Sequence, residues 1–562
     1  MSLLTDALFN LFRLLRNAYA RAFRRPPDFV WVAVTGDLPE FEPTKKSLLR
    51  RRLDPRPPAP SLEGIRERLD HVLADGRVGG VILRVQNLDA GWAALEELRA
   101  ELHRFRSNGK KVVAYLIDPG TRSYYLASAA NEIFASPLST LNVVGLRTRV
   151  NFLKDALESL GLKTEVFAVS PYKSAADPLA RSDFTQEARE QVERLLDRRF
   201  GELIAAISAG RGIPPEEVRA LVDGAPYSAA EAVRKGLLDG ALYEDGLPER
   251  LADGEKSAKL AEWQVAKRAL RVRYRRRARK KLVGLVRVTG AIMRGRSRRL
   301  PVPLPLIGRE QAGSDSVVAA LRVAEKSRHI GAILLHVDSP GGDALASDLI
   351  WREVERIRQK KPVVVLMGNA AASGGYYVSA AANLIVASKN TITGSIGVIL
   401  ARPVAAGLFG KLKVNPVTIE RGARSNLLDP RRHPTPDEMS VLNGQLQNFY
   451  GEFKNRVERG RKLQPDVLEE IAGGRVWTGD EALKRGLVDE TGGFRTVLEK
   501  ARELAGIPDD LSDVLVKIPP PKKDRPTPGE PVREALEAVR DALSELSTTR
   551  VWALAPYEIS DD

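Results

Sequence analysis

Three glycine-flanked segments in the second half of the chain contain the residues best suited to chemistry. They read Asp-Ser-Pro-Gly-Gly-Asp over 338–343, Ala-Ala-Ser-Gly-Gly-Tyr over 371–376 and Thr-Gly-Ser-Ile-Gly over 393–397, and each follows a predicted strand. Ser373 stands among small residues at the predicted start of a helix, where it would be accessible and where partial positive charge favours an oxyanion. We therefore expect Ser373 to be a nucleophile.

The other two segments could assist such a nucleophile. Gly341 and Gly342 follow a buried strand, and adjacent glycines let backbone amides turn towards developing negative charge. Taken alone, this segment could equally be a plain turn from a strand to a helix. Ser395 could be a turn residue or a hydroxyl that positions another catalytic group.

A serine nucleophile needs a base, and no histidine lies in a comparable glycine-flanked segment. His336 falls within an apolar strand and is expected to be a core or strand-face residue. A lysine can be the base only where burial lowers its pKa towards neutrality. Lys173 lies among small and apolar residues in Val-Ser-Pro-Tyr-Lys-Ser-Ala-Ala-Asp over 169–177. It is the candidate base, and an ordinary surface lysine is the alternative.

The chain repeats itself once. Residues 80–85 resemble 332–337, residues 124–131 resemble 376–383, and residues 231–239 resemble 481–489. The order and the nearly constant offset indicate a duplicated domain. Ser373 corresponds to Thr121 in the first half, whereas Lys173 corresponds to Ala423 in the second. The two halves therefore complement each other, and we predict one composite site whose lysine comes from the first repeat.

Each half alternates strands with helices. Short apolar runs over 81–85, 112–117, 333–337 and 363–367 predict buried strands, and residues 95–105 and 349–357 predict amphipathic helices. This order is typical of α/β layering around a largely parallel sheet.

The amino-acid composition excludes several kinds of functional site. The 562 residues are 43% hydrophobic and 28% charged, which is ordinary for globular protein. The chain has no cysteine, which excludes disulfides, cysteine metal sites and cysteine nucleophiles. Its five histidines show no metal-binding spacing, so no metal site is predicted. The net charge of +16 suits anionic partners, either lipid or nucleic acid.

Two basic segments indicate which kind of anionic partner the chain could bind. Residues 1–25 place leucines and alanines at helical spacing with arginines opposite, which predicts an amphipathic helix for a membrane interface or for packing on protein. Nine of the fourteen residues over 268–281 are Lys or Arg. That run is a solvated linker or an anionic-lipid contact. Nucleic-acid binding is disfavoured because no aromatic platform or recognised motif accompanies the charge. No apolar window is long enough for a transmembrane helix, and no secretory signal is visible.

These motifs together resemble the signal peptide peptidase A family, in the long tandem-repeat form of the S49 serine peptidases. The matching pieces are Ser-Pro-Gly-Gly over 339–342, Ala-Ser-Gly-Gly-Tyr over 372–376, Thr-Gly-Ser-Ile-Gly over 393–397, Tyr-Lys-Ser over 172–174 with Asp-Pro over 177–178, Arg-Val-Trp-Thr-Gly over 475–479 and Gly-Leu-Val-Asp over 486–489. The resemblance covers residues 28 to 508.

The resemblance implies the site and its chemistry. It implies that Ser373 is the nucleophile, Lys173 the general base and Ser395 the hydroxyl that orients the lysine. The oxyanion would be held by the backbone amides of Gly341, Gly342 and Gly374. No metal or organic cofactor is expected. The implied substrates are hydrophobic peptides, including remnant signal peptides, or unfolded membrane-proximal chains.

The resemblance also implies the architecture, which is two tandem crotonase- and Clp-protease-like α/β domains of repeated ββα units, assembled as a homotetramer. We expect a basic amphipathic N-terminal helix over 1–27, a first S49-like repeat over 28–255 and a basic linker or helix over 256–281. A second S49-like repeat follows over 282–508. A Pro-rich linker and a C-terminal helix or tail occupy 509–562, with the helix expected over 534–546.

The sequence leaves alternatives open for the protein's location and for its function. The long family form commonly has a transmembrane helix where this chain has its Arg-rich amphipathic stretch. We therefore expect peripheral attachment to a bacterial-type cytoplasmic membrane, on its cytoplasmic face, with a cytoplasmic protein as the alternative. A crotonase-fold acyl-CoA enzyme would use the same kind of amide pocket to stabilise a thioester enolate. A non-catalytic membrane-associated scaffold would use only the basic segments.

Overall fold

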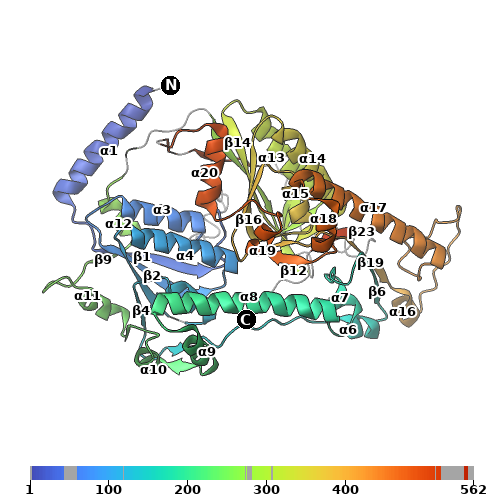
Figure 1. Cartoon of the computed structure of the whole chain (residues 1–562), viewed down its shortest axis with the longest axis horizontal. Coiled ribbons are helices and arrows are strands. Elements are labelled where there is room, and N and C mark those ends of the chain that lie inside the picture. The colour runs from blue at the N-terminus through green and yellow to red at the C-terminus, as the bar shows by residue number, and fades with distance from the viewer. Residues whose placement is uncertain are drawn as a thin grey trace. The chain divides into compact units, whose positions relative to one another are not determined.

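The computed structural model of the chain is shown in Figure 1. It describes residues 3–42, 60–117, 119–272, 274, 281–304, 308–509, 511–512, 514–519 and 550–554. The chain forms two compact units. The first contains residues 1–147, 196–277 and 510–512, and the second contains residues 148–195, 278–509 and 513–562. The segment that carries Lys173 therefore belongs to the second unit, although it lies in the first half of the sequence.

The first unit is built on a parallel sheet in the order β8-β4-β3-β2-β1-β9. Its strands carry the apolar runs predicted from the sequence, and their continuous burial is typical of a sheet covered on both faces. The strands are β1 (Phe29–Gly36), β2 (Gly80–Leu88), β3 (Lys111–Leu116), β4 (Glu132–Ala135), β8 (Gly240–Ala241) and β9 (Leu260–Glu262). A separate pair joins β5 (Thr140–Leu141) to β7 (Tyr227–Ser228).

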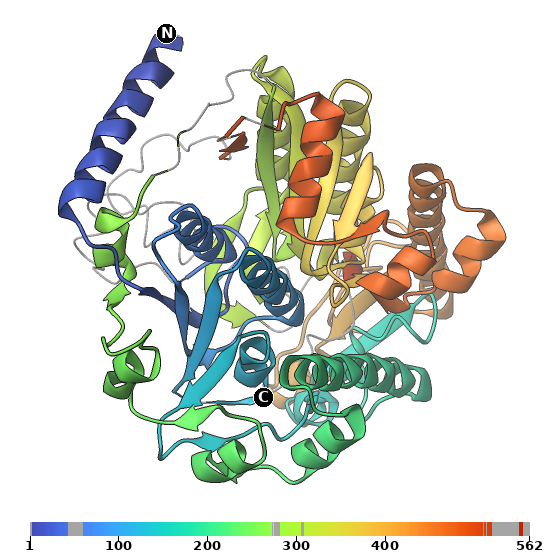
Figure 2. The same cartoon turned by 60° about the vertical axis from the view of Figure 1, so that its left-hand side comes forward.

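Helices α3 and α4 pack on this sheet, as the blue helices beside the blue strands in Figure 2 show. The helices of the unit are α3 (Leu62–Leu73), α4 (Trp92–Ser107), α5 (Thr121–Ala127), α9 (Pro215–Asp223), α10 (Ala229–Arg234), α11 (Leu247–Arg250) and α12 (Trp263–Ala269), with a 3-10 turn at Glu244–Gly246. Helix α8 (Gln186–Arg211) contributes its residues from 196 onward.

Helix α1 (Leu3–Phe23) packs on the first unit through its polar side. Asn17 exchanges two hydrogen bonds of 2.9 Å with the backbone of Val272, and Ala20 is buried. The large apolar side chains of the helix are exposed instead: Phe9, Leu11, Phe12, Leu14, Leu15, Tyr19 and Phe23. Of the basic run 268–281, the structure describes 268–272, 274 and 281, and the other positions lie outside the described residues.

The second unit contains an eight-stranded sheet with the path β20-β18-β16-β14-β10-β22, in which β17 pairs with β16 and with β21. All of its pairs are parallel except β18 with β20. Its strands are β10 (Leu282–Thr289), β14 (Ile330–Ser339), β16 (Val363–Ala372), β17 (Leu384–Ala387), β18 (Ile392–Gly394), β20 (Val476–Thr478), β21 (Glu490–Thr491) and β22 (Leu515–Lys517). Strands β14 and β16 end directly before the predicted catalytic segments.

A second sheet of this unit has the order β12-β13-β11-β15-β23-β19-β6. Its strands are β6 (Lys163–Ala168), β11 (Ala291–Met293), β12 (Arg298–Leu304), β13 (Gly308–Gly313), β15 (Gly341–Asp343), β19 (Ile399–Val404) and β23 (Arg550–Leu554). Residues 341–343, expected to be a loop, therefore form a paired strand. The helix expected over 534–546 lies outside the described residues.

Some helices of the second unit begin at side-chain caps. Asp343 caps α14 (Ala344–Arg358) by accepting the N–H of Ala346 at 2.8 Å, and Thr435 and Thr478 form capping boxes at α17 (Pro436–Arg461) and α19 (Gly479–Lys484). The others are α6 (Lys154–Ser159), α7 (Asp177–Ala180), α13 (Ser314–Lys326), α15 (Gly374–Ser379), α16 (Ala406–Lys411), α18 (Pro465–Ile471) and α20 (Phe494–Ala505).

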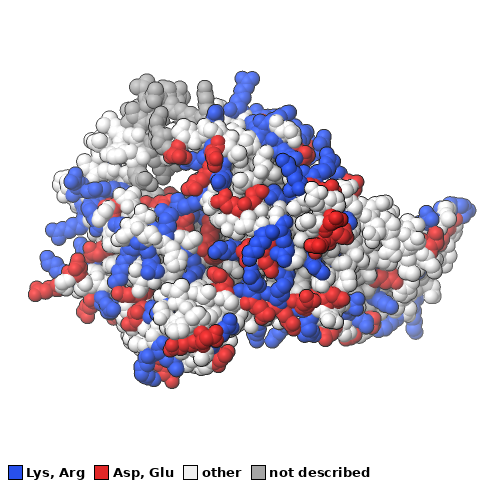
Figure 3. All heavy atoms as spheres, in the orientation of Figure 1, with Lys and Arg blue, Asp and Glu red and all other residues white. Residues whose placement is uncertain are grey.

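The charged side chains of the chain are mixed rather than segregated on the face drawn in Figure 3. Lys and Arg side chains, drawn in blue, are interspersed there with Asp and Glu side chains, drawn in red. On that face the positive net charge does not gather into the kind of stripe that tracks a nucleic-acid backbone.

Candidate active site

The structure brings the three predicted side chains together within the second unit. Lys173 follows β6, Ser373 lies between β16 and α15, and Ser395 follows β18. The Lys173 ammonium nitrogen Nζ lies 2.6 Å from Ser373 Oγ and 2.8 Å from both the Oγ and the carbonyl oxygen of Ser395. All three side chains are fully buried. The geometry therefore links a serine hydroxyl to an amine that a second serine holds at two points.

Burial alone lowers the pKa of Lys173 well below its ordinary value. An ammonium group loses its hydration when it is buried, and without a compensating carboxylate the neutral amine is favoured. A neutral amine has two hydrogens and one lone pair. Nζ lies within hydrogen-bond reach of both Ser395 oxygens and of Ser373 Oγ, so a neutral amine that donates to the two Ser395 oxygens presents its lone pair to the Ser373 hydroxyl.

The backbone of Ser373 is held in a left-handed conformation, with φ 56° and ψ −114°. Its N–H donates to the carbonyl of Gly394 at 2.8 Å, and its own carbonyl accepts the N–H of Tyr377 at 2.8 Å. A left-handed non-glycine residue costs about 1–2 kcal/mol, and such strain concentrates at functional sites. The small neighbours are required as well, because a Cβ at Gly375 would lie 2.7 Å from the carbonyl oxygen of Ser339.

The three glycines predicted to hold the oxyanion differ in their surroundings and hydrogen bonds. The N–H of Gly341 donates to Ser339 Oγ at 3.1 Å, so this amide already has a partner, contrary to the expectation that it faces substrate. At Gly342 a Cβ would lie 2.0 Å from the carbonyl oxygen of Ile292, so only glycine fits between β11 and its neighbour. Gly374 begins α15, where a helical N–H has no carbonyl partner within the helix.

A short segment over 473–475 packs along the lysine, and the sequence analysis gave it no role. At Gly474, with φ 86°, a Cβ would lie 2.7 Å from the Cβ of Lys173. The Gly474 N–H donates to the carbonyl of Ile396 at 2.8 Å, and the Arg475 carbonyl accepts the N–H of Ser395 at 2.7 Å. The segment therefore touches Lys173 and also fixes the Ser395 turn.

Two further contacts anchor this segment. The Tyr450 hydroxyl accepts the N–H of Gly473 at 3.1 Å, and Ser170 donates its hydroxyl to the Gly473 carbonyl. The guanidinium of Arg475 lies 4.3 Å from the ring centroid of Tyr172, beside the lysine in sequence. The glycine pair before the motif at 475–479 was the available signal for this support.

Asp177, which belongs to the predicted lysine motif, is the first residue of α7. Burial raises the pKa of its carboxyl to about 6, and Arg181 lies 3.6 Å away as its ion-pair partner. Asp177 therefore ends the lysine segment, and its ion pair joins it to Arg181. Within the described ranges, no three His, Asp or Glu side chains gather closely enough to hold a metal ion.

The sequence pattern of peptidase family S49 matches residues 104–258 and again residues 355–508, more than half of the chain. The chain belongs to peptidase family S49. The chloroplastic serine protease SPPA of Arabidopsis thaliana is 33% identical over 481 residues, 83% of this chain and 69% of that protein. Protease 4 of Haemophilus influenzae is 30% identical over 449 residues, 76% of this chain and 71% of that protein. The chain is therefore a serine peptidase with two tandem S49 repeats, and its substrates are peptides.

The S49 repeats have the Clp-protease-like fold that the sequence predicts. The Clp protease family pattern matches residues 307–392, which run from β13 through β18. Among solved structures, a membrane-bound stomatin-specific protease is similar at 17% identity and a TM-score of 0.27 over 43% of this chain and 99% of that one. In the part of the S49 peptidase that the structure describes, no helix is both long and apolar enough to cross a membrane.

Proposed function

We propose that this S49 peptidase is a serine endopeptidase with a Ser–Lys dyad, in which Ser373 is the nucleophile and Lys173 the general base. The observation that carries the proposal is the 2.6 Å approach of Lys173 Nζ to Ser373 Oγ in a fully buried site. A base must lie within hydrogen-bond reach of the proton it removes and must be uncharged when it does so. Ser395 is a positioning residue that orients the amine through both of its oxygens.

The reaction follows from this geometry. Neutral Lys173 removes the proton of the Ser373 hydroxyl as Oγ attacks the scissile carbonyl carbon. Negative charge develops on the carbonyl oxygen, and the amides of Gly342 and Gly374 are the proposed donors that stabilise it. Protonated Lys173 then gives its proton to the leaving amine, and an acyl-enzyme remains. Water, deprotonated by Lys173, releases the acyl group and regenerates the serine.

For the substrates, we propose hydrophobic peptides such as remnant signal peptides or unfolded membrane-proximal chains. A putative signal peptide peptidase SppA of Enterococcus faecium, 33% identical over 199 residues, supports this choice by its name. A homotetramer, expected from the resemblance, belongs to the same proposal, and size-exclusion chromatography with light scattering tests it.

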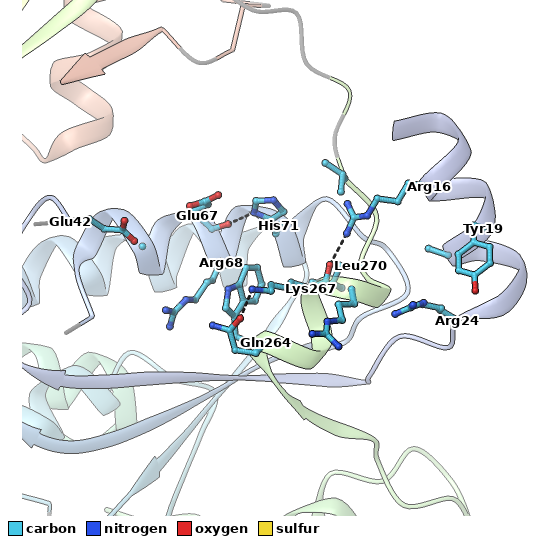
Figure 4. Close-up of a pocket in the computed structure, with 15 residues that line it drawn as sticks. Arg16, Tyr19, Arg24, Glu42, Glu67, Arg68, His71, Gln264, Lys267 and Leu270 are labelled. Atoms are coloured by element: carbon cyan, nitrogen blue, oxygen red, sulfur yellow. Dashed lines mark hydrogen bonds between the residues drawn. The ribbon is translucent and has the colours of Figure 1, made fainter. Parts of the chain in front are cut away.

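We also propose that the peptidase attaches to the surface of an anionic membrane through α1. The support is that α1 turns its polar side to its own unit and its apolar side outward, the reverse of a helix that packs on protein. Beside it lies a cavity, shown in Figure 4, whose lining has two acidic side chains, Glu42 and Glu67, and more cationic ones: Arg16, Arg24, Arg68, Lys267 and Arg268. The Arg16 guanidinium donates to the Lys267 carbonyl at 2.8 Å, which fixes the helix to this basic wall.

The test compares purified wild type with Ser373→Ala and Lys173→Ala on an unfolded, casein-like polypeptide. Both variants are expected to lose cleavage while remaining folded. Thr121→Ala is the matched control, because it alters the corresponding position of the other repeat and should cleave normally. If cleavage survives Ser373→Ala, the assignment of this serine is wrong. Normal turnover of an acyl-CoA by Ser373→Ala would favour the crotonase-type alternative.

A further inference from the structure

The cavity of Figure 4 lies within the first unit, between α1, α3 and α12. Its volume is about 810 Å³, which is within the range of small-molecule binding sites. Five Lys or Arg side chains line it against two Glu side chains, so its lining is positively charged. The cations are Arg16 on α1, Arg24 directly after α1, Arg68 on α3, and Lys267 and Arg268 on α12. An anion inside the cavity is therefore approached by cations from three parts of the unit.

Arg68 is the cation in this cavity whose charge the protein balances least. Its side chain is half-buried, and among the residues that the structure describes it makes no hydrogen bond or ion pair. Its guanidinium carbon lies 5.9 Å from the ring centroid of Trp263. Burial lowers the pKa of Arg68, although the carboxylates of Glu42 and Glu67 act in the opposite direction. A bound anion would therefore stabilise the charged form of Arg68.

The neighbouring cations contact neutral groups. Arg16 donates to the Lys267 carbonyl at 2.8 Å, as the dashed line in Figure 4 shows, and the Lys267 ammonium donates to the side-chain oxygen of Gln264. The guanidinium carbon of Arg24 lies 5.9 Å from the ring centroid of Tyr19. Among the described residues, none of these three cations has an acidic ion-pair partner. A phosphate group suits this arrangement, because its oxygens point in several directions and match the donors of guanidinium groups.

Tyr19 joins the cavity to the exposed apolar side of α1. It lines the cavity and is 54% exposed, and its ring centroid lies 5.1 Å from that of Phe23, which is 75% exposed. Trp263 lines the cavity as well, and Tyr and Trp are the side chains typical of membrane interfaces. A ligand whose anionic group enters the cavity would extend its remaining part along apolar side chains. These surroundings favour an amphipathic ligand over a free anion.

We propose that this cavity binds the phosphate of one anionic phospholipid headgroup, with Arg68 as its main partner and the acyl chains beside Tyr19 and Phe23. The proposal rests on the proposed attachment through α1, and it adds a saturable site for a single lipid to that attachment. Basic pockets at membrane surfaces bind phosphorylated headgroups in this way. The bound phosphate would also join α1 to α3 and α12 through their cations.

The experiment measures the binding of dihexanoyl phosphatidylglycerol, below its micellar concentration, to the full-length peptidase by titration calorimetry. Wild type is expected to bind one lipid per chain. Arg68→Gln should bind it about 10-fold or more weakly, because a charge-assisted hydrogen bond is lost, and should cleave peptide in solution as wild type does.

Arg21→Gln is the matched control. Arg21 is an exposed arginine of α1 that does not line the cavity, so its loss removes the same charge without changing the site. This variant should bind the short-chain lipid as wild type does. The absence of saturable binding by wild type, or equal affinity in Arg68→Gln and Arg21→Gln, would overturn the proposal.

Two competitors identify the source of the phosphate. Glycerol 3-phosphate should compete at least about 10-fold more weakly than the short-chain lipid, because it has no acyl chains to contact the apolar side chains. Equal competition would show a site for free phosphate compounds and would overturn the assignment to a lipid. Dihexanoyl phosphatidylcholine has no net charge and should not compete. Competition as strong as that of phosphatidylglycerol would contradict a site that selects an anionic headgroup.

The proposed attachment through α1 can fail separately. Phe12 does not line the cavity, so Phe12→Glu should keep wild-type affinity for the short-chain lipid while it loses binding to phosphatidylglycerol vesicles. If Phe12→Glu still binds vesicles, the attachment is wrong and the headgroup site stands on the calorimetry. If Phe12→Glu loses vesicle binding and Arg68→Gln binds the short-chain lipid as wild type does, the attachment stands and the headgroup site is wrong.

Discussion

The two repeats of the S49 peptidase keep the same frame and differ in the site. In the first unit the Tyr124 hydroxyl donates to the Leu237 carbonyl at 2.7 Å, and in the second the Tyr376 hydroxyl donates to the Leu487 carbonyl at 2.8 Å. A hydrogen bond near the start of one strand is repeated as well. Asn131 accepts the N–H of Val112 at 2.9 Å in the first unit, and Asn383 accepts the N–H of Val363 at 2.8 Å in the second.

The same correspondence extends to a pair of charges. Arg211 pairs with Asp239 at 2.8 Å in the first unit, and Arg461 pairs with Asp489 at 2.6 Å in the second. Each aspartate also accepts a backbone N–H near the start of a strand, Asp239 from β4 and Asp489 from β17, at 2.7 Å in both units. These repeated bonds are structural, since the first unit makes them without a nucleophile.

The difference lies at the start of one short helix. Residue 120, the cap of α5, has an ordinary φ of −88°, and Thr121 donates its hydroxyl to the Gly145 carbonyl at 3.1 Å. The cap of α15 is Ser373 itself, with φ 56°. The comparison teaches that this helix can begin without a positive φ at its cap. Among the described residues a positive φ is also found at other non-glycine positions of both units, such as Leu38 and Ser395. Four experiments would break or sharpen this contrast.

The largest effect is expected for Lys173→Met. It should reduce kcat/KM by about 10³-fold or more, because the serine loses its base. It should also raise the melting temperature at pH 7, because the folded state no longer holds a buried amine that the unfolded state protonates. Activity and thermal unfolding are measured on the same samples. Retained activity, or a lowered melting temperature, would contradict a buried neutral lysine.

Gly474→Ala tests the segment that packs on the lysine. The new Cβ would meet Lys173 and would also place a left-handed φ on a non-glycine residue, so we expect a roughly 100-fold loss of kcat/KM and about 1–3 kcal/mol of destabilisation. Gly444→Ala is the matched control. It lies in α17 with open space around it, and alanine there should be neutral or stabilising. Equal behaviour of the two variants would remove Gly474 from the support of the site.

The pH dependence follows from the lowered pKa of Lys173. The rate constant kcat/KM should rise about tenfold per pH unit below that pKa and level off above it, since only the neutral amine is a base. The free energy of unfolding should also rise with pH between the pKa of Lys173 in the folded state and its pKa in the unfolded state. In that range the unfolded state binds a proton that the folded state lacks. Ser395→Ala should move the acid limb of the kcat/KM profile. A profile unchanged by Ser395→Ala would contradict the positioning role.

The smallest effect concerns α1, which belongs to the first unit. Phe12→Glu and Leu15→Glu should each weaken binding to phosphatidylglycerol vesicles by about 10-fold and leave peptide cleavage in solution unchanged. Leu138→Glu is the control, because Leu138 is 88% exposed on the same unit but outside α1. Co-sedimentation measures the binding. Equal binding by all three variants, or binding to neutral vesicles alone, would contradict the proposed surface.

The features predicted correctly from the sequence are those that depend on local patterns of residues. The apolar runs located β14 and β16, whose carboxyl ends lead to Gly341 and to Ser373, and the complementary loss of residues in the two repeats pointed to Lys173. The pattern did not reveal the strand at 341–343 or the partner of the Gly341 amide, because both depend on pairing with distant segments. The support from Gly474 and Tyr450 was not predicted either: the glycine pair at 473–474 was a signal, but the contacts themselves join residues far apart along the chain.

The left-handed backbone of Ser373 has an evolutionary consequence. As long as catalysis is selected, the chain retains a residue whose conformation opposes its own stability. Once a duplicated copy is released from that selection, substitutions that relax the turn gain free energy of folding while they abolish the nucleophile. Drift and stability then act in the same direction, so a redundant copy of this site should be lost readily and regained rarely. In the first unit the counterpart of Ser373 is Thr121, the first residue of α5, and the cap before it is Gly120 with a φ of −88°.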